Sequence, residues 1–187
     1  MQRLIDDLWG PSGRDRHYAF LRLRELGARA APVVPLLLCE IEMNIERMLC
    51  REDCHGPWLD DDVAALTAIG APAVAPTIDA ATAPCAAPVG RARDGRPCRN
   101  PQMDVELCSW RRGLLARALE AQGPPAVPQL TDCLVTRPAN GIVLCAEVLR
   151  ALGPAARTAA PVLRQKTEDA RLAVRSAAKR ALLAIEE

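Results

Sequence analysis

Aromatic residues and histidines are scarce in this sequence. Only 3% of the 187 residues are aromatic, although half are hydrophobic. A core poor in rings and rich in Ala, Leu, Val and Ile suits closely spaced helices better than a β-sandwich, which favours aromatic and β-branched side chains. The two histidines, His17 and His55, are too few for a histidine-rich di-iron site. The composition therefore predicts an all-α chain without that class of metal enzyme.

The sequence also lacks a large excess of charge of either sign, and it has no long apolar run. The 24 basic residues nearly balance the 23 acidic ones, so no strong field draws the chain to nucleic acid or to an anionic membrane. No uninterrupted apolar segment approaches the roughly 18 residues that span a bilayer. The first residues, with Asp6 and Asp7, do not resemble a signal peptide. We expect a soluble, cytoplasmic monomer; a periplasmic or extracellular location is the alternative if a signal peptide was removed and the cysteines are oxidised.

Motifs for catalysis are absent as well. The sequence contains no Gly-rich phosphate loop, no G-x-S-x-G elbow and no H-E-x-x-H pair. We therefore predict that the chain is not an enzyme and holds no cofactor and no metal.

A repeat is the strongest feature that is present. Four stretches each end an apolar helical segment with a glycine, continue through a short Ala/Pro-rich turn and open a second apolar segment: LRELGARAAPVVPLLL, ALTAIGAPAVAPTI, ALEAQGPPAVPQL and VLRALGPAARTAAPVL. We call Gly27, Gly70, Gly123 and Gly153 the marker glycines. A glycine past a helix end readily adopts positive φ, and a following proline starts a new helix but cannot continue the old one. The repeat therefore predicts antiparallel helical hairpins that must stack to bury their apolar sides.

The spacing before each marker glycine supports this interpretation. A leucine stands four positions before every one, and positions one and eight before it are apolar in most copies, as on one buried side of a helix. Gln122 and Asp62 are the two exceptions to this stripe. Residues Ala178, Leu182 and Ile185 follow the same spacing, so the C-terminal segment is a fifth copy without its glycine.

These patterns predict five helix pairs in one domain, 1–187, interrupted by an irregular insertion at about 79–102. The insertion is rich in Pro, Gly, Ala and Arg and has no apolar period. The predicted helices are 2–9, 14–26, 31–49, 57–69, 72–81, 103–122, 125–136, 139–152, 156–167 and 169–186.

Residues 169–185, DARLAVRSAAKRALLAI, resemble the second helix of a HEAT repeat of the phycobilisome-lyase type. The resemblance implies an α-solenoid, a right-handed superhelix of stacked pairs. It also implies that an acid and an arginine tie neighbouring repeats together. The positions that match this acid–arginine pattern are Asp169 with Arg175, Glu106 with Arg112, and Arg16 without its acid.

Eight cysteines leave three interpretations open. Disulfides would staple the insertion and the connector before it, and their candidates are Cys85, Cys98, Cys50, Cys54 and Cys108. A zinc site would use Cys50, Cys54 and His55, although the spacing is not that of a C-x-x-C pair. Reduced thiols are the third interpretation, in which Cys39, Cys133 and Cys145 act as small buried hydrophobic residues in helices.

The resemblance implies that the second helix of each pair lines a concave face. Residues six and three positions before each marker glycine, and the residue of the fifth copy in the same register, would then face a partner: Leu21, Arg24, Ala64, Thr67, Arg117, Glu120, Glu147, Arg150 and Arg180. Arg117 with Glu120, and Glu147 with Arg150, are opposite charges at i, i+3 that partly neutralise each other. A solvated helix face is the alternative to a binding groove.

We therefore expect a non-catalytic HEAT-like (armadillo-like) scaffold or adaptor that binds another protein. A bilin-lyase-like enzyme or lyase subunit is one alternative, because such lyases carry similar repeats. A HEAT-like DNA-binding protein is the other, although the balanced charge and the Arg/Glu pairs disfavour it.

Overall fold

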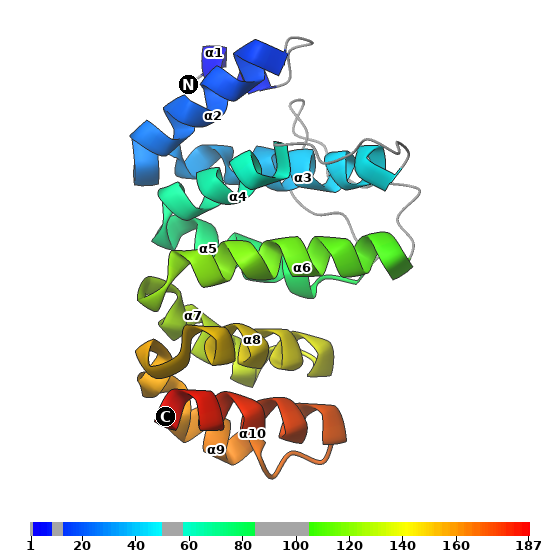
Figure 1. Ribbon diagram of the computed structural model, residues 1–187, viewed down its shortest axis with the longest axis vertical. Coiled ribbons are helices and arrows are strands. Elements are labelled where there is room, and N and C mark those ends of the chain that lie inside the picture. Colours follow the sequence, from blue (N-terminus) through cyan, green and yellow to red (C-terminus); the bar gives the residue numbers. More distant parts are fainter. Residues whose placement is uncertain (1, 9–12, 50–57, 85–104) are drawn as a thin grey trace. The chain divides into compact units, whose positions relative to one another are not determined.

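A computed structural model describes residues 2–8, 13–49, 58–84 and 105–187 (Figure 1). Within these residues every regular element is a helix, which confirms the all-α prediction. The α-helices are α1 Gln2–Leu8, α2 Gly13–Leu26, α3 Val34–Leu49, α4 Trp58–Ile69, α5 Ala71–Thr82, α6 Val105–Gln122, α7 Val127–Thr136, α8 Ala139–Leu152, α9 Ala160–Lys166 and α10 Leu172–Glu186. Three 3₁₀ helices lie between them: η1 Gly27–Val33, η2 Pro124–Ala126 and η3 Gly153–Ala159.

Several predicted boundaries need correction. Helices α3, α7 and α9 begin at Val34, Val127 and Ala160 rather than at 31, 125 and 156, because the residues before them form 3₁₀ helices. Helix α5 continues to Thr82, so the first four residues of the predicted insertion, 79–82, are helical. The last helix begins at Leu172 rather than at 169, because Asp169 to Arg171 are not helical. Residues 85–102 of the predicted insertion lie outside the described residues.

The four marker glycines all have positive φ, between 52° and 74°. Gly70 has φ 74° and ψ −144°, and Gly123 has φ 68° and ψ −150°. This combination is open essentially to glycine alone, and is more restrictive than the ordinary left-handed helical region. The Gly70 amide donates to the Leu66 carbonyl (3.3 Å), and the Gly70 carbonyl accepts from the Ala73 amide (2.8 Å). Gly70 therefore ends one helix and begins the next.

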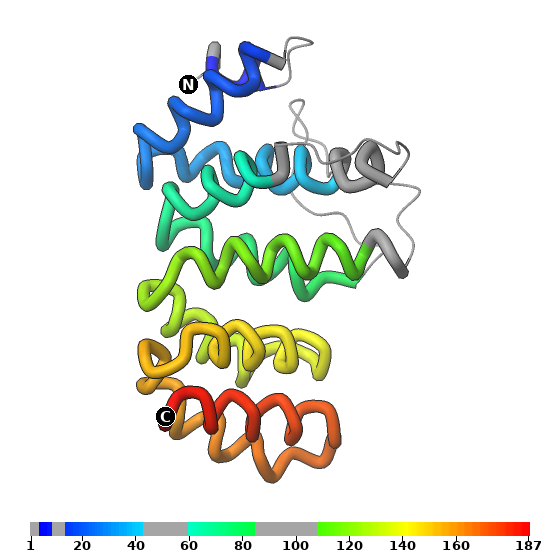
Figure 2. Tube along the Cα trace, viewed as in Figure 1, coloured from blue at the N-terminus to red at the C-terminus, as the bar shows by residue number. Residues whose placement is uncertain are grey.

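The described helices fall into two compact units, Met1–Ala118 and Leu119–Glu187, whose traces are drawn in Figure 2. In the first unit α1 packs on α2, α2 on α4, and α3 on α4 and α5. In the second unit α7 pairs with α8, α9 pairs with α10, and α8 packs most extensively against α10. The Gly153 corner thus leads from one pair to the next, and does not join the two helices of a pair as the sequence interpretation assumed.

The predicted stripe is the buried side of each helix. The leucines four positions before the marker glycines, Leu23, Leu66, Leu119 and Leu149, have no exposed surface. Both exceptions noted in the sequence lie in the core as well, because Asp62 is 0% and Gln122 is 9% exposed. Helical position therefore determines burial here even where the residue is polar.

One stretch of the described chain, Ala139–Lys166, is long and apolar enough to cross a membrane by length and composition. It is not one continuous α-helix, because Gly153, with φ 56°, ends α8 and η3 precedes α9. About 39% of its apolar window is buried inside the protein. The buried part of the stretch includes Ile142, Cys145 and Leu149 on α8.

Candidate functional site

The nine residues predicted to face a partner are not buried. Arg24, Arg117, Arg150 and Arg180 are exposed. The other five, Leu21, Ala64, Thr67, Glu120 and Glu147, are partly exposed. Their spacing thus places them on the outer side of α2, α4, α6, α8 and α10.

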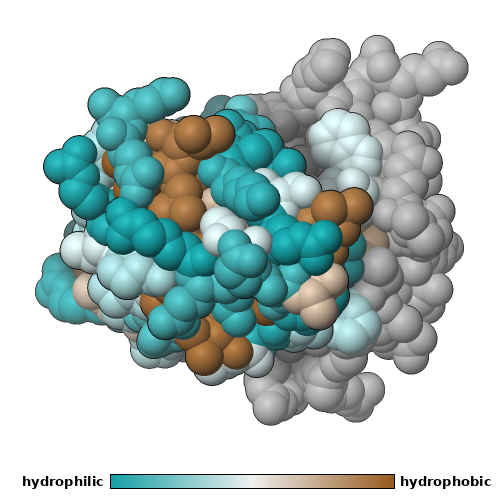
Figure 3. Space-filling model, turned by 90° about the horizontal axis from the view of Figure 1, so that it is seen from below, coloured by the Kyte–Doolittle hydropathy of each residue, from teal (hydrophilic) through white to brown (hydrophobic). Residues whose placement is uncertain are grey.

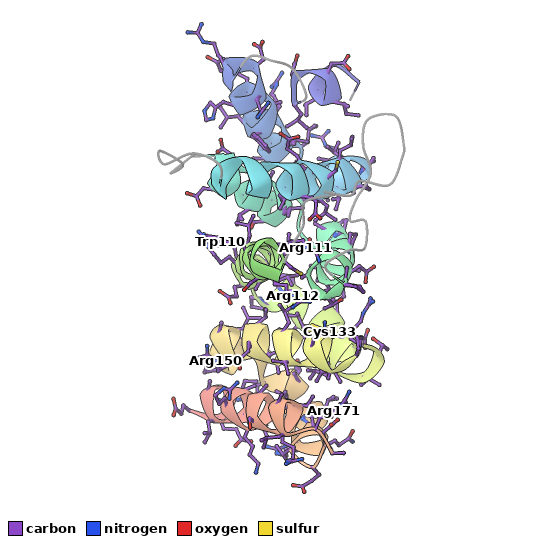
Figure 4. The ribbon with its side chains drawn as sticks, turned by 90° about the vertical axis from the view of Figure 1, so that its right-hand side faces the viewer. Trp110, Arg111, Arg112, Cys133, Arg150 and Arg171 are labelled. Atoms are coloured by element: carbon purple, nitrogen blue, oxygen red, sulfur yellow. A yellow bond between two sulfur atoms is a disulfide. The ribbon has the colours of Figure 1, made fainter. Side chains whose placement is uncertain are left out.

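In the second unit three of these residues meet. The Glu147 carboxylate on α8 accepts a hydrogen bond from Arg150 Nε at 2.7 Å. Its other oxygen accepts from Arg180 on α10, from Nε at 3.2 Å and also from Nη2. We call Glu147, Arg150 and Arg180 the α8–α10 cluster; Figure 4 labels Arg150 on its helix. The predicted i, i+3 pair of Glu147 and Arg150 is therefore present, and Arg180 joins it from the neighbouring helix.

Electrostatics keep Glu147 ionised. Partial burial alone would raise the pKa of this carboxyl group, but hydrogen bonds from Arg180 and Arg150 outweigh burial and lower the pKa below its ordinary value. At neutral pH the cluster thus holds one negative and two positive charges. Its side chains remain open to solvent, with 33% of Glu147, 48% of Arg150 and 54% of Arg180 exposed.

An apolar side chain lies beside this cluster. Leu183 follows Arg180 by three residues on α10 and is 65% exposed. Residues three apart on a helix are neighbours on its surface. In Figure 3, separate brown hydrophobic patches are each bordered by teal hydrophilic residues. Leu183 therefore offers an exposed apolar contact close to the charged groups of the cluster.

The first unit has its own charged contacts on α2, α4 and α6. Arg117 on α6 lies 3.3 Å from a carboxylate oxygen of Asp60 on α4. His17 on α2 lies 3.3 Å from Asp61, the next residue of α4. The sequence interpretation paired Arg117 with Glu120, and the structure corrects this because Arg117 reaches the neighbouring helix instead. Thr67 uses its hydroxyl within α4, donating to the Val63 carbonyl at 2.7 Å.

A buried arginine that the sequence interpretation missed lies in the same unit. Arg111 on α6 is fully buried, and its Nη1 is 3.3 Å from each carboxylate oxygen of Glu42 on α3. Its Nη2 donates to the carbonyls of Ala83 (3.1 Å) and Pro84 (3.3 Å), just after α5. In Figure 4 Arg111 points away from the side on which Trp110 lies. Arg111 thus connects three segments of the first unit.

Asp169 and Arg175, two of the residues predicted to tie repeats together, make local contacts. Arg175 donates to the backbone carbonyls of Asp169 and Ala170, each at 2.8 Å. The Asp169 carboxylate pairs with Arg171 at 2.8 Å, and this hydrogen bonding lowers the Asp169 pKa. Both residues therefore order the turn before α10, which differs from the role implied by the resemblance.

The remaining positions of that set lie in the first unit. Arg16 on α2 is 3.5 Å from Glu40 on α3, an acid that the repeat pattern did not identify. Arg112 lies on α6 and is partly buried. The side chain of Glu106 is outside the described part of the structure.

Cysteine pairing corrects one of the three sequence interpretations. Cys133 on α7 and Cys145 on α8 form a disulfide, with an S–S distance of 2.03 Å. Cys39 and Cys108 are disulfide-bonded as well. The expectation that Cys39, Cys133 and Cys145 are buried was right, but the expectation that they are reduced was wrong. Cys108 is oxidised, as the disulfide interpretation predicted; Cys50, Cys54, Cys85, Cys98 and His55 lie outside the described residues.

No group of three or more His, Cys, Asp or Glu side chains that could hold a metal ion occurs in the described parts of the chain. Comparisons of the chain with protein families, with curated proteins and with solved structures gave no match. The candidate site therefore stands on its own geometry, which is a solvent-facing, mixed-charge surface on packed helices.

Proposed function

We propose that the chain is a HEAT-like α-solenoid of five helix pairs, in a right-handed superhelix, that serves as a non-catalytic scaffold. Its second helices would present a concave face to a segment of another protein. In such a fold an extended surface binds a partner without a deep pocket.

The observation that carries this proposal is the α8–α10 cluster. Its residues were selected by repeat position, and in the second unit Glu147, Arg150 and Arg180 join two successive second helices through ion pairs at the surface. Recurring corners at the marker glycines support the same proposal, because each positive φ occurs at the same point of a repeat. Side chains held in place on rigid helices bind a partner at a low cost in conformational entropy.

The test is capture of a partner by the full chain from extracts of its source organism, followed by mass spectrometry. Arg150→Glu/Arg180→Glu reverses the charge of the proposed face. Arg157→Glu is the matched control, because Arg157 is exposed at the corner η3 and belongs to none of the predicted positions. We expect one protein to be retained by the wild type and by the control and lost from the double variant. Equal retention by all three would refute the proposed face.

We further propose an oxidising compartment, the periplasmic or extracellular alternative, in place of the cytoplasmic expectation. The support is that Cys39, Cys108, Cys133 and Cys145 are all disulfide-bonded. Stable structural disulfides are typical of secreted and periplasmic proteins and rare in the cytosol of mesophiles. Trapping thiols by alkylation at the moment of cell lysis tests this proposal, since these four cysteines should remain unmodified until a reductant is added.

A further inference from the structure

We propose that Arg150 and Arg180 together bind a carboxylate side chain of the partner, within a segment that places an apolar residue beside that acid. The inference rests on the proposed scaffold function and names the chemistry that its face would recognise. The ligand is an Asp or Glu next to a residue such as Leu in a protein chain.

The α8–α10 cluster carries more positive than negative charge. Two guanidinium groups share the single carboxylate of Glu147, so the cluster keeps one net positive charge. Arg150 engages Glu147 through Nε alone, which leaves its Nη groups without a partner among the described residues. Arg180 donates to Glu147 from Nε and Nη2, so its Nη1 has no partner among the described residues. Guanidinium donors in this fixed planar arrangement match a second carboxylate.

The two arginine side chains are held in position. Glu147 accepts hydrogen bonds from Arg150 and Arg180, and so restrains both side chains on the surface of α8 and α10. These two helices pack most extensively against each other within the second unit. Less side-chain freedom is then lost when a ligand binds. The donors that remain are thus preorganised for an incoming acid.

An apolar side chain lies next to Arg180 on α10. Leu183, 65% exposed, lies one helical turn from Arg180, so a ligand that pairs with Arg180 brings its adjacent side chain over Leu183. Burying apolar surface adds to the binding energy in proportion to the area covered. A lone anion would not gain this contact, which favours a protein segment over a free carboxylate.

The mixed charge of the cluster also favours a protein carboxylate over nucleic acid as the ligand. A groove for a nucleic-acid backbone is more uniformly basic than this one. Here the carboxylate of Glu147 lies between the two guanidinium groups and would repel a run of phosphates. A single carboxylate matches the one net positive charge of the cluster.

The experiment measures binding of the full, disulfide-bonded chain to a fluorescent 12-residue peptide of alternating Glu and Leu. Peptides of alternating Gln and Leu and of alternating Lys and Leu are the matched probes. We expect the Glu/Leu peptide to bind at least tenfold more tightly than either. Arg150→Gln and Arg180→Gln should each weaken it about tenfold, whereas Arg157→Gln should leave it unchanged.

Two further variants test the electrostatic and the apolar contributions to peptide binding separately. Glu147→Gln removes the negative charge next to the ligand but keeps one side-chain oxygen that can accept from the two arginines. The lost repulsion should outweigh the lost restraint, so this variant should bind the Glu/Leu peptide at least threefold more tightly. Leu183→Ser should weaken the Glu/Leu peptide severalfold without changing its preference over the Gln/Leu peptide. Unchanged or weaker binding by Glu147→Gln would overturn the electrostatic argument.

The outcomes also distinguish this inference from the proposed function. Equal binding of the Glu/Leu and Gln/Leu peptides, or tighter binding of a 12-nucleotide single-stranded DNA, would overturn the acidic ligand. If Arg150→Glu/Arg180→Glu still loses its captured partner in that case, the scaffold proposal stands. If partner capture is insensitive to the face while the acidic peptide binds as expected, the scaffold proposal fails and the carboxylate site remains.

Discussion

The two units each carry an arginine–carboxylate contact between neighbouring helices, but in opposite surroundings. In the first unit Arg111 and Glu42 are 0% and 1% exposed at their side chains. In the second unit Arg180 and Glu147 are 54% and 33% exposed. A buried charge must keep its partner because water cannot replace it, whereas an exposed arginine can exchange or add a partner at little cost. The first contact therefore anchors the fold, and the second is suited to binding.

The largest expected effect comes from breaking the buried contact. Arg111→Met removes the cation beside Glu42 and the donor to the Ala83 and Pro84 carbonyls. Breaking a buried ion pair costs roughly 3–5 kcal/mol of the free energy of unfolding. Urea unfolding followed by circular dichroism measures this loss.

The matched control for that experiment is Arg117→Gln. Arg117 also lies on α6 and pairs with an acid, Asp60, but both side chains are mostly exposed. We expect the control to change the free energy of unfolding by less than about 1 kcal/mol. Comparable losses in the two variants would show that burial does not distinguish the two kinds of contact.

The next largest effect concerns the covalent link of the second unit. Cys133→Ala/Cys145→Ala opens the disulfide between α7 and α8, whose cysteines are 12 positions apart. Removing a cross-link of this size should lower the free energy of unfolding by about 3 kcal/mol in the chain-entropy model. The difference from wild type should nearly vanish when both proteins are unfolded under strong reductant. If the difference persists unchanged in reductant, the lost stability comes from changed packing rather than from the missing disulfide.

Alanine substitutions at two glycines of the first unit test the corner geometry. They should have smaller effects on stability, in opposite directions. Gly70 has φ 74°, whereas Gly113 is not among the positive-φ glycines; an added Cβ at either would meet nothing within 4 Å. Gly70→Ala should therefore cost about 1–3 kcal/mol of backbone strain. Gly113→Ala lies within α6 and should stabilise the protein by roughly 0.5–1 kcal/mol. Calorimetric melting temperatures that move in the same direction would argue against the corner geometry.

Local features of the fold were predictable from the sequence. The marker glycines, the leucines before them and most helix boundaries depend on residues only a few positions apart, which is the range over which capping and periodicity act. Pairing between helices depends on tertiary packing instead. The disulfide of Cys133 and Cys145 was missed for that reason, because their meeting requires α7 and α8 to lie side by side.

Arg111 shows how a signal in the sequence was overlooked. It occupies the buried stripe of α6, four residues before Leu115 and eight before Leu119. The repeat pattern drew attention to Arg112 instead, because arginines recur eleven positions before the marker glycine. An arginine at a stripe position implies a buried acid on a neighbouring helix, but the sequence does not reveal that Glu42 provides it. In the α8–α10 cluster, by contrast, the repeat position alone identified every member.

The smallest expected effect is the contribution of the exposed cluster to stability, and it depends on pH. The folded-state pKa of Glu147 is lowered from its ordinary value of 4.5, so its ionised form stabilises the fold above that value. This contribution is lost as the pH falls through the lowered folded-state pKa, because both states are then protonated. Since the side chain is one-third exposed, Glu147→Gln should cost less than about 1 kcal/mol at pH 7, and less at pH 2 than at pH 7.

Urea unfolding at both pH values measures the difference, with Glu120→Gln as the control. Glu120 holds another of the predicted outward positions, on α6, and is partly exposed. A pH-independent difference for Glu147→Gln would mean that the cluster acts through packing rather than charge. A cost of several kcal/mol at pH 7 would make the exposed contact equivalent to the buried one, and Arg150 and Arg180 would then be structural anchors rather than donors available to a partner.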